Sequence, residues 1–247
     1  MIKLDLEPAF VLHSRAFKES SLILELFTKN HGHISAIAKG AKRPKSKFRG
    51  IVQPFNSMLI SGSARSELLT LTVAESTEPR IELKAQGLLS GIYLNELLMK
   101  LFSKNEAYPK LFDYYLEVLQ ILSKEPHNVA VLRYFEKELL EILGYGLDLK
   151  YDAISKQEII ASQKYIFNPY DGFFLYRESE LKNNIVVSGS TIISLREQSL
   201  IEKESFIEAK RILRFALMLH LKSSLKSSMF YKKVKVADPK KELVLND

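Results

Sequence analysis

The first 80 residues of the chain contain short hydrophobic runs that are separated by turn residues. In the second run, Leu22, Leu24 and Leu26 share one face, because successive side chains of a strand point to opposite sides. We expect a turn at residues 61–66, and strands at residues 8–17, 54–60, 67–76 and 20–40, the last of which divides into two strands at Asn30-His31-Gly32. About five short strands with turns between them predict a small barrel.

From Leu88 onward the hydrophobic positions follow a helical period instead. Leu88, Ile92, Leu97 and Leu101 fall on one stripe of a helix expected at residues 87–103. Three further helices are expected at residues 108–123, 125–146 and 206–227, with a short β excursion near residues 157–177. The pattern predicts an α+β protein in which a five-stranded barrel domain, residues 1–80, is packed on a mainly helical domain, residues 81–247.

Charge is distributed unevenly along the 247 residues, whose formal net charge is +7. Residues 1–80 contain 12 Lys or Arg and 7 Asp or Glu, for a net +5, whereas residues 81–202 contain 13 and 17, for a net −4. Residues 203–241 contain 11 and 3, for a net +8. Two basic ends around an acidic middle favour a polyanionic partner, because clustered cations create a field that dispersed cations do not.

Composition excludes several kinds of site and location. Without Cys, the chain has neither a disulfide framework nor a thiolate metal site. The first ten residues include acidic side chains that a secretory signal lacks, and no stretch approaches the ~18 uncharged apolar residues of a membrane span. We therefore expect a cytoplasmic protein that associates with no membrane.

No arrangement of residues points to catalysis or to a cofactor. His31 and His33 have a spacing that two metal ligands can have, although residues of a hairpin turn are more often simple surface. Residues 223–226 match the Ser-x-x-Lys pattern of acylating enzymes but lack its companion motifs, and there is no glycine-rich phosphate loop. The sequence predicts a protein that is not an enzyme and needs no metal or other cofactor.

The strongest candidate site is the basic segment at residues 38–50, which has six cations and no acid. Lys and Arg neutralise phosphates and release counterions, which supplies affinity for nucleic acid without sequence preference. Phe48 either stacks on a base or packs beneath the loop, and Arg15, Lys18 and Arg65 are expected to border the same face. The candidate DNA-binding residues of the segment are Lys39, Lys42, Arg43, Lys45, Lys47, Phe48 and Arg49.

The last predicted helix is a second candidate for contacts with nucleic acid. Its basic residues recur at a spacing that places them roughly along one side. They are Lys210, Arg211, Arg214 and Lys222. The alternative for this helix and for the basic segment is an ordinary solvated surface.

Several segments follow one another in an order that resembles a known family. They are VLHSRAFKESSLILELFTKNHGHISAIAKGAKRPKS (residues 11–46), QPF (53–55), AES (74–76), YLNELLMKL (93–101), LRYFEKELLEILGYG (132–146) and AKRILRFALMLHLKSSLKS (209–227). No single block is a strict motif, but the ordered set resembles the RecO family of DNA repair proteins along nearly the whole chain.

The resemblance implies an oligonucleotide/oligosaccharide-binding (OB) barrel that is followed by a helical domain. Proteins of the family bind single- and double-stranded DNA, anneal complementary strands, and work with RecR to load the RecA recombinase onto DNA coated by single-stranded-DNA-binding protein. A nucleoid-associated location and a contact with RecA that is only indirect follow from the same resemblance. An RNA-binding barrel protein of translation or RNA processing remains the alternative, because the basic segment alone serves either polymer.

The sequence departs from many RecO relatives at one place. Those relatives carry a four-cysteine zinc module after the helix that ends in LGYG, whereas this chain has no Cys. The segment KYIFNPYDGFFLYR, residues 164–177, lies where the module would be. We expect its aromatic residues to hold the region together without metal, namely Tyr165, Phe167, Phe173 and Tyr176.

The resemblance also implies a docking site for the acidic C-terminal tail of single-stranded-DNA-binding protein. Such a tail ends in apolar residues, so its site needs a hydrophobic notch with a cation beside it for the terminal carboxylate. Arg133, which is flanked by Leu132, Tyr134 and Phe135, takes this role by resemblance. The alternative, which stays open at this point, is an ordinary helix pair in which Arg133 has Glu136 and Lys137 as its neighbours.

Overall fold

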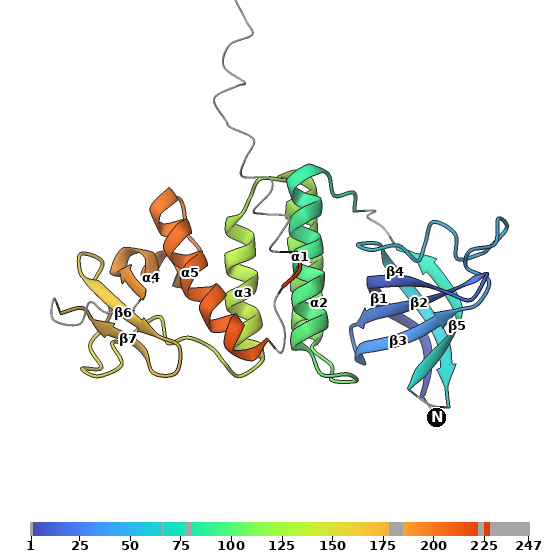
Figure 1. Ribbon diagram of the computed structural model, residues 1–247, viewed down its shortest axis with the longest axis horizontal. Helices are drawn as coiled ribbons and strands as arrows, with labels where there is room; N and C mark the ends of the chain where they lie inside the picture. The colour runs from blue at the N-terminus through green and yellow to red at the C-terminus, as the bar shows by residue number, and fades with distance from the viewer. Residues whose placement is uncertain (1, 66, 78–80, 178–184, 222–224, 228–247) are drawn as a thin grey trace, which may run out of the picture. The chain divides into compact units, whose positions relative to one another are not determined.

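The computed structural model describes residues 2–65, 67–77, 81–177, 185–221 and 225–227 (Figure 1). The chain divides into two compact units. The first unit comprises the described residues of Met1–Ala107, Leu122–His127 and Lys222–Asp247, and the second comprises those of Tyr108–Ile121 and Asn128–Leu221.

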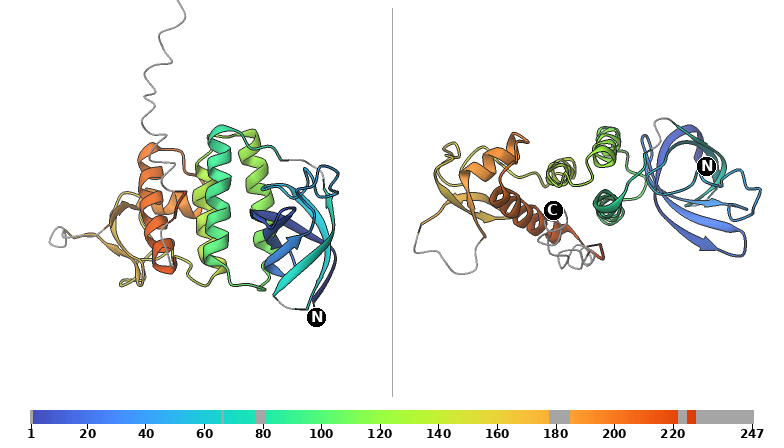
Figure 2. Two further views of the ribbon diagram at one scale, coloured as in Figure 1. Left: turned by 45° about the vertical axis from the view of Figure 1, so that its right-hand side comes forward. Right: turned by 90° about the horizontal axis from the view of Figure 1, so that it is seen from above.

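Five strands of the first unit form a closed barrel in the order β1-β2-β3-β5-β4 (Figure 2). They are β1 (Ile2–Phe17), β2 (Ser21–Thr28), β3 (Gly32–Ala38), β4 (Ser57–Ala64) and β5 (Leu68–Ser76). β3 and β5 pair in parallel, and the other neighbouring strands pair antiparallel. Closure leaves the barrel without a free sheet edge. The barrel is OB-like, and with the helices described below it confirms the predicted α+β fold class.

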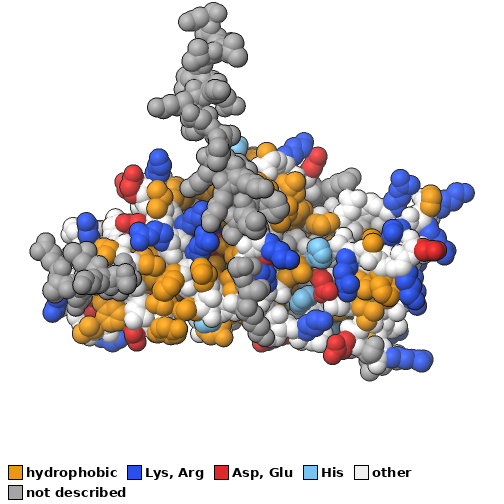
Figure 3. Space-filling view, viewed as in Figure 1, with side chains coloured by type: hydrophobic (Ala, Val, Ile, Leu, Met, Phe, Trp, Pro, Cys, Tyr) orange, Lys and Arg blue, Asp and Glu red, His pale blue; other side chains and the backbone are white. Residues whose placement is uncertain are grey.

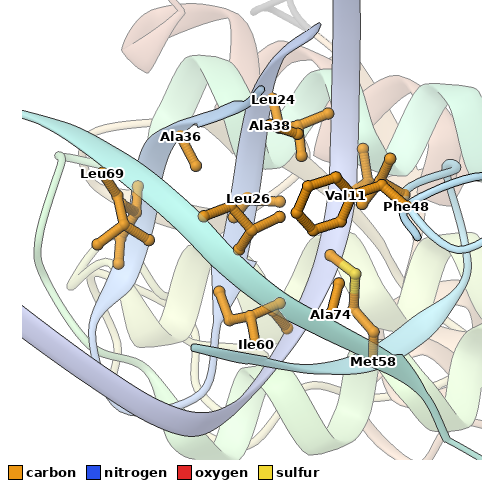
Figure 4. Packing of buried hydrophobic residues seen from close by; sticks show 14 of the residues in the cluster. Val11, Leu24, Leu26, Ala36, Ala38, Phe48, Met58, Ile60, Leu69 and Ala74 are labelled. Atoms are coloured by element: carbon orange, nitrogen blue, oxygen red, sulfur yellow. The ribbon is translucent and has the colours of Figure 1, made fainter. Parts of the chain in front are cut away.

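Alternating residues of the strands fill the interior of the barrel (Figure 4). Leu24 pairs in register with Ala36 and Leu26 pairs with Ile34, so the inward face of β2 continues onto β3. Leu24 and Leu26 are fully buried, and Leu22 packs against the same cluster. The predicted shared face of the three leucines is therefore confirmed.

Two strands extend beyond the boundaries predicted for them. β1 begins at Ile2 rather than at residue 8, and its register with β4 shifts between Leu4 and Glu7, where Leu6 has a φ of +49°. The turn predicted at residues 61–66 is wrong, because β4 continues to Ala64. Gly62 lies at a β-bulge, and a Cβ atom there would lie only 2.6 Å from the carbonyl oxygen of Thr70. Glycine thus permits a close approach of strands where its sequence context suggested a turn.

Helix α1 (Ala85–Leu101) packs with the barrel in the first unit. The buried side chain of Asn95 donates a hydrogen bond of 2.9 Å to the carbonyl oxygen of Leu12. A Cβ atom on Gly91 would lie 2.8 Å from the ring of Phe55, so only glycine allows this approach. Because α1 shares a unit with the barrel, packing does not divide the chain at residue 80, and that domain boundary stays a prediction.

The second unit combines helices with a small sheet in the order β7-β6-β8. The elements are α3 (Ala130–Ile142), β6 (Lys164–Asn168), β7 (Gly172–Leu175), β8 (Ile185–Ser188), α4 (Gly189–Arg196) and α5 (Lys203–His220), while α2 (Pro109–Lys124) contributes residues to both units. The predicted β excursion begins at Lys164, and residues 157–161 form no strand. We did not predict β8 and α4, and α5 ends at His220 rather than at residue 227.

Side-chain caps and aromatic packing organise the segment from Asp152 to Leu175. The carboxylate of Asp152 accepts hydrogen bonds from the amides of Ile154, Ser155 and Leu175 at 2.6–2.9 Å. Burial alone would raise the pKa of Asp152, but these hydrogen bonds hold it below its usual value. The rings of Phe167 and Phe173 lie 5.1 Å apart in the buried face of the hairpin.

Candidate nucleic-acid interface

The basic segment connects β3 to β4 as a series of tight turns. The amides of Arg43, Ser46 and Arg49 each donate to the carbonyl oxygen three residues earlier, at 3.0–3.2 Å. Gly40 and Gly50 have φ values of +72° and +76°, which side chains other than glycine rarely adopt. The glycines of the sequence therefore shape an ordered loop.

Phe48 attaches this loop to the barrel. Its side chain is 3% exposed and belongs to the hydrophobic cluster of the barrel, together with Ala41 and Val52 of the same loop (Figure 4). The expectation that Phe48 stacks on a base is corrected, since its ring is covered by the barrel core. The alternative, packing beneath the loop, describes its position, because an aromatic ring gains more from burial than from exposure.

Two of the six cations in the loop make contacts that hold the loop itself. The ammonium of Lys47 donates a 2.5 Å hydrogen bond to the carbonyl oxygen of Thr72 on β5, and it lies 5.4 Å from the ring centroid of Phe48. The guanidinium of Arg49 donates to the carbonyl oxygen of Pro44 at 3.0 Å. These two side chains therefore stabilise the loop and its attachment to the wall of the barrel.

The other four cations of the loop point into solvent. They make no side-chain hydrogen bond or ion pair with any described residue, and all four are exposed: Lys39, Lys42, Arg43 and Lys45. In the space-filling view, Lys and Arg side chains gather around the barrel, at the right of Figure 3. Four cations without an internal partner on one ordered loop can each meet a phosphate without first losing an ion pair.

The turn between β1 and β2 adds a further cation beside the loop. The amide of Lys42 donates to the carbonyl oxygen of Ser20 at 2.9 Å, which ties the loop to this turn. Lys18 lies in the same turn, with an exposed side chain and a φ of +53°. Arg15 and Arg65, which were expected to border the same face, are exposed as well.

The second candidate surface lies on α5, which belongs to the second unit. Lys210, Arg211 and Arg214 are exposed, whereas Lys222 lies outside the described residues. The exposed side of α5 also carries apolar side chains, with Phe215 40% exposed. That this helix and the loop act on one DNA molecule stays a prediction.

Arg133 lies on α3 in a setting that the sequence did not indicate. It is buried, and its guanidinium forms an ion pair with Glu136, whose side chain is 1% exposed. The Nε atom of Arg133 is buried and has no hydrogen-bond partner among the described residues. Of the two neighbours that the alternative named, Glu136 forms an ion pair with Arg133, and a role of Arg133 in binding a partner stays a prediction.

The candidate metal ligands have other partners. His33 Nε2 lies 2.9 Å from Glu25 Oε2, which also accepts a hydrogen bond from the hydroxyl of Ser35. His31 Nδ1 lies 3.5 Å from Glu7 Oε2. Across the described residues, no group of three or more His, Cys, Asp or Glu is arranged to hold a metal ion.

We predict that chelation leaves this protein intact. Exhaustive treatment with EDTA and phenanthroline should change neither its melting temperature nor its binding to DNA, because the chain contains no Cys and Asp152 caps the loops by direct hydrogen bonds. Thermal unfolding and an oligonucleotide-binding titration before and after chelation test this. Stoichiometric, tightly held zinc in the purified protein would contradict it.

Comparison with known proteins identifies the family of the chain. Residues 1–80 match the family model described as Recombination protein O N terminal, and residues 85–229 match the one described as Recombination protein O C terminal. This chain belongs to the RecO family.

Individual RecO proteins are similar to it over most of their length. The DNA repair protein RecO of Coxiella burnetii is 41% identical over 212 residues, which cover 86% of this chain and 90% of the relative. That of Glaesserella parasuis is 37% identical over 227 residues, which cover 91% of this chain and 94% of the relative. Membership in RecO supports a general role in recombinational DNA repair. No helix within the described residues is long and apolar enough to cross a membrane.

Proposed function

We propose that this RecO-family protein binds single- and double-stranded DNA without sequence preference and anneals complementary strands. The observation that carries the proposal is the loop between β3 and β4, where Lys39, Lys42, Arg43 and Lys45 are exposed and have no partner among the described residues. Annealing requires that two polyanions approach each other while their bases stay free to pair. Cations that contact only phosphates meet both requirements, and no chemical step or cofactor is needed.

We further propose that the protein helps to load recombinase onto DNA that is coated by single-stranded-DNA-binding protein. RecR would be its partner in this step and RecA would be contacted indirectly, as the family membership suggests. For the acidic tail of the coating protein we assign Arg133, whose buried Nε–H still lacks a hydrogen-bond acceptor among the described residues. A carboxylate that enters beside α3 would satisfy this donor.

Strand annealing tests the proposal directly. Two complementary oligonucleotides are used, one labelled with a donor and the other with an acceptor fluorophore. They are mixed in one experiment as naked strands, and in a second experiment as strands that are already coated with single-stranded-DNA-binding protein. We expect the protein to accelerate duplex formation in both cases. Acceleration of naked strands only would leave DNA binding in place and refute the loading role, and no acceleration in either case would refute annealing. Tighter binding to RNA than to DNA of the same sequence would favour the RNA-binding alternative.

The cations of α5 are expected to contribute to annealing. Changing Arg211 and Arg214 together to Glu should slow annealing by about tenfold or more, because two contacts with phosphate become two repulsions. Both side chains are exposed, so the melting temperature should fall by no more than ~2 °C. Reversal of the exposed Lys124 and Lys164 is the matched control. A loss of annealing that is accompanied by a large loss of stability would indicate an ordinary solvated helix face instead.

A further inference from the structure

The exposed side of α5 is apolar as well as basic. The opposite side is buried in the second unit through Ala209, Ile212, Leu213, Ala216 and Leu217. Four large apolar side chains nevertheless remain exposed, namely Ile207, Phe215, Met218 and Leu219. With 3.6 residues per turn, these four fall within about 120° of the helix circumference, so they form one apolar face. A single exposed apolar side chain is ordinary, whereas several on one face indicate a binding surface.

Two arginines accompany this apolar face. Arg211 is one turn before Phe215, and Arg214 is one turn before Met218, so each arginine has an apolar neighbour on its own row of the helix. Both arginines are exposed, and Arg214 has no side-chain hydrogen bond or ion pair with any described residue. Arginine suits this setting, because its planar guanidinium is weakly hydrated and still binds phosphate.

The stretch of α5 that carries the arginines has no acid of its own, since residues 209–221 contain neither Asp nor Glu. Glu208, which precedes this stretch, attracts Arg211. Its carboxylate, however, already accepts hydrogen bonds from the amide of Ser188 and the hydroxyl of Thr191 at 3.0 and 2.6 Å. A second copy of this face would bring like charges together, whereas a polyanion would be attracted. The face therefore suits a partner that is both anionic and apolar.

The ring of Phe215 is supported by one aromatic neighbour. Its centroid lies 6.4 Å from that of Phe167, with the ring planes at 77°, so the contact is edge to face. Phe167 is 3% exposed, whereas Phe215 is 40% exposed. A ring that is supported from one side and open to solvent on another can stack with a flat group, and little side-chain freedom remains to be lost.

We propose that single-stranded DNA crosses α5 with an unpaired base stacked on Phe215 and with its phosphates on Arg211 and Arg214. This inference rests on the proposed contact between α5 and DNA, and it adds a preference for single strands, because the faces of paired bases are covered by their neighbours in a duplex. Stacking covers the face of a base and leaves its hydrogen-bonding edge free, so a held strand can still pair. Pairing then removes the base from the ring, and the duplex is held by its phosphates alone.

A tryptophan reporter tests the stacking, and the chain has no native Trp. Phe215→Trp keeps an aromatic ring at the position, and binding of a labelled oligothymidine should lower its fluorescence at least about twofold, because a stacked base quenches indole. Ile201→Trp is the matched control. It is also exposed, it lies beside Glu202 and Glu204, and it is at least roughly 18 Å from Phe215 along the helix, so its fluorescence should change little. Anisotropy of the labelled oligothymidine reports binding itself.

The outcomes separate this inference from the proposed DNA binding. Oligothymidine that binds without quenching the Phe215→Trp reporter, or that quenches both reporters equally, would overturn the stacking and leave DNA binding in place. A duplex that quenches as strongly as the single strand would do the same. A reporter that responds to polyglutamate and not to oligothymidine would assign the face to an acidic protein segment and overturn the proposal. If neither single strand nor duplex binds, the proposed function is refuted and the stacking with it.

Affinity gives a second measure of the stacking. Phe215→Leu keeps an apolar contact with Phe167 but removes the aromatic face, so it should weaken binding of oligothymidine at least about fivefold more than binding of duplex. Phe215→Tyr keeps the ring and should bind oligothymidine like the unchanged protein. Equal losses for single strand and duplex, or the same loss in Phe215→Tyr, would overturn the proposal. If Phe215→Leu does not fold, the fluorescence of the Phe215→Trp reporter decides.

Discussion

Replacing Lys39, Lys42, Arg43 and Lys45 together by Ala is expected to weaken binding to DNA of every sequence and to flatten its salt dependence. Each contact with phosphate contributes ~0.7–0.9 to the slope of log affinity against log salt, so four lost contacts reduce the slope by about 3. Over a fourfold rise in salt, the affinity of the unchanged protein should then fall about 60-fold more than that of the variant. Fluorescence anisotropy titrations at several salt concentrations measure both quantities.

The structure decides which cations belong in this variant. Lys47 and Arg49 donate to the carbonyl oxygens of Thr72 and Pro44, so removing them would loosen the loop as well as reduce its charge. The matched control replaces four exposed lysines outside the loop, namely Lys84, Lys110, Lys124 and Lys164. It should change the slope by less than 1 and leave sequence-independent binding in place. A slope that the loop variant leaves unchanged would remove the loop from the DNA interface.

The fold was largely predictable because its elements have their own local signals. The alternation of Leu22, Leu24 and Leu26 and the helical period from Leu88 specify secondary structure through burial on one face. β8 and α4 were missed because both segments are short, with four and eight residues, and a tertiary contact helps to define them. The carboxylate of Glu208 on α5 accepts hydrogen bonds from the amide of Ser188 and the hydroxyl of Thr191. Such a contact joins residues that are distant in the sequence, so no local period reveals it.

The sequence predicts that the candidate site is basic, but it does not predict which cations hold the loop and which are exposed. A run of cations without acids is visible in the sequence, whereas the carbonyl groups that engage Lys47 and Arg49 become neighbours only when the loop folds back. The burial of Phe48 follows the general tendency of aromatic rings to pack, and that alternative was recognised. Lys18 lies beside the loop because the amide of Lys42 donates a hydrogen bond to the carbonyl oxygen of Ser20 in the same turn as Lys18. The spacing of these residues in the sequence does not indicate this contact.

Arg133 is a charged residue that is nevertheless buried with the apolar residues of α3. Its neighbours Leu132 and Phe135 are buried, and the ring of Phe135 lies 5.9 Å from that of Tyr114. Arg133 is buried as well, and Glu136, one turn further on, supplies the opposite charge. The available signal in the sequence is a Glu three residues after an Arg on an apolar helix face. We considered this neighbour only as part of the alternative.

Removing Arg133 alone is expected to destabilise the protein strongly. Arg133→Met leaves the buried carboxylate of Glu136 without the cation that faces it, which costs about 3–5 kcal/mol of unfolding free energy. Arg133→Glu should be worse, because it places two carboxylates side by side. Replacing both partners, as Arg133→Met with Glu136→Leu, should restore most of the lost free energy, since no buried charge remains. Urea unfolding of the three variants measures these differences, and a double variant that is as unstable as Arg133→Met would contradict the expectation.

The double variant also separates the structural role of Arg133 from binding of the acidic tail. Because it is expected to fold, weaker binding of a fluorescent tail peptide cannot be attributed to unfolding. If the guanidinium receives the terminal carboxylate of the tail, the double variant should bind the peptide at least tenfold more weakly, which corresponds to the loss of one charge-assisted hydrogen bond. Its affinity for naked DNA should not change, because the four exposed cations of the loop are untouched. Unaltered peptide affinity in a folded double variant would remove Arg133 from the tail site and leave it the role that its contacts describe, the buried half of an ion pair with Glu136.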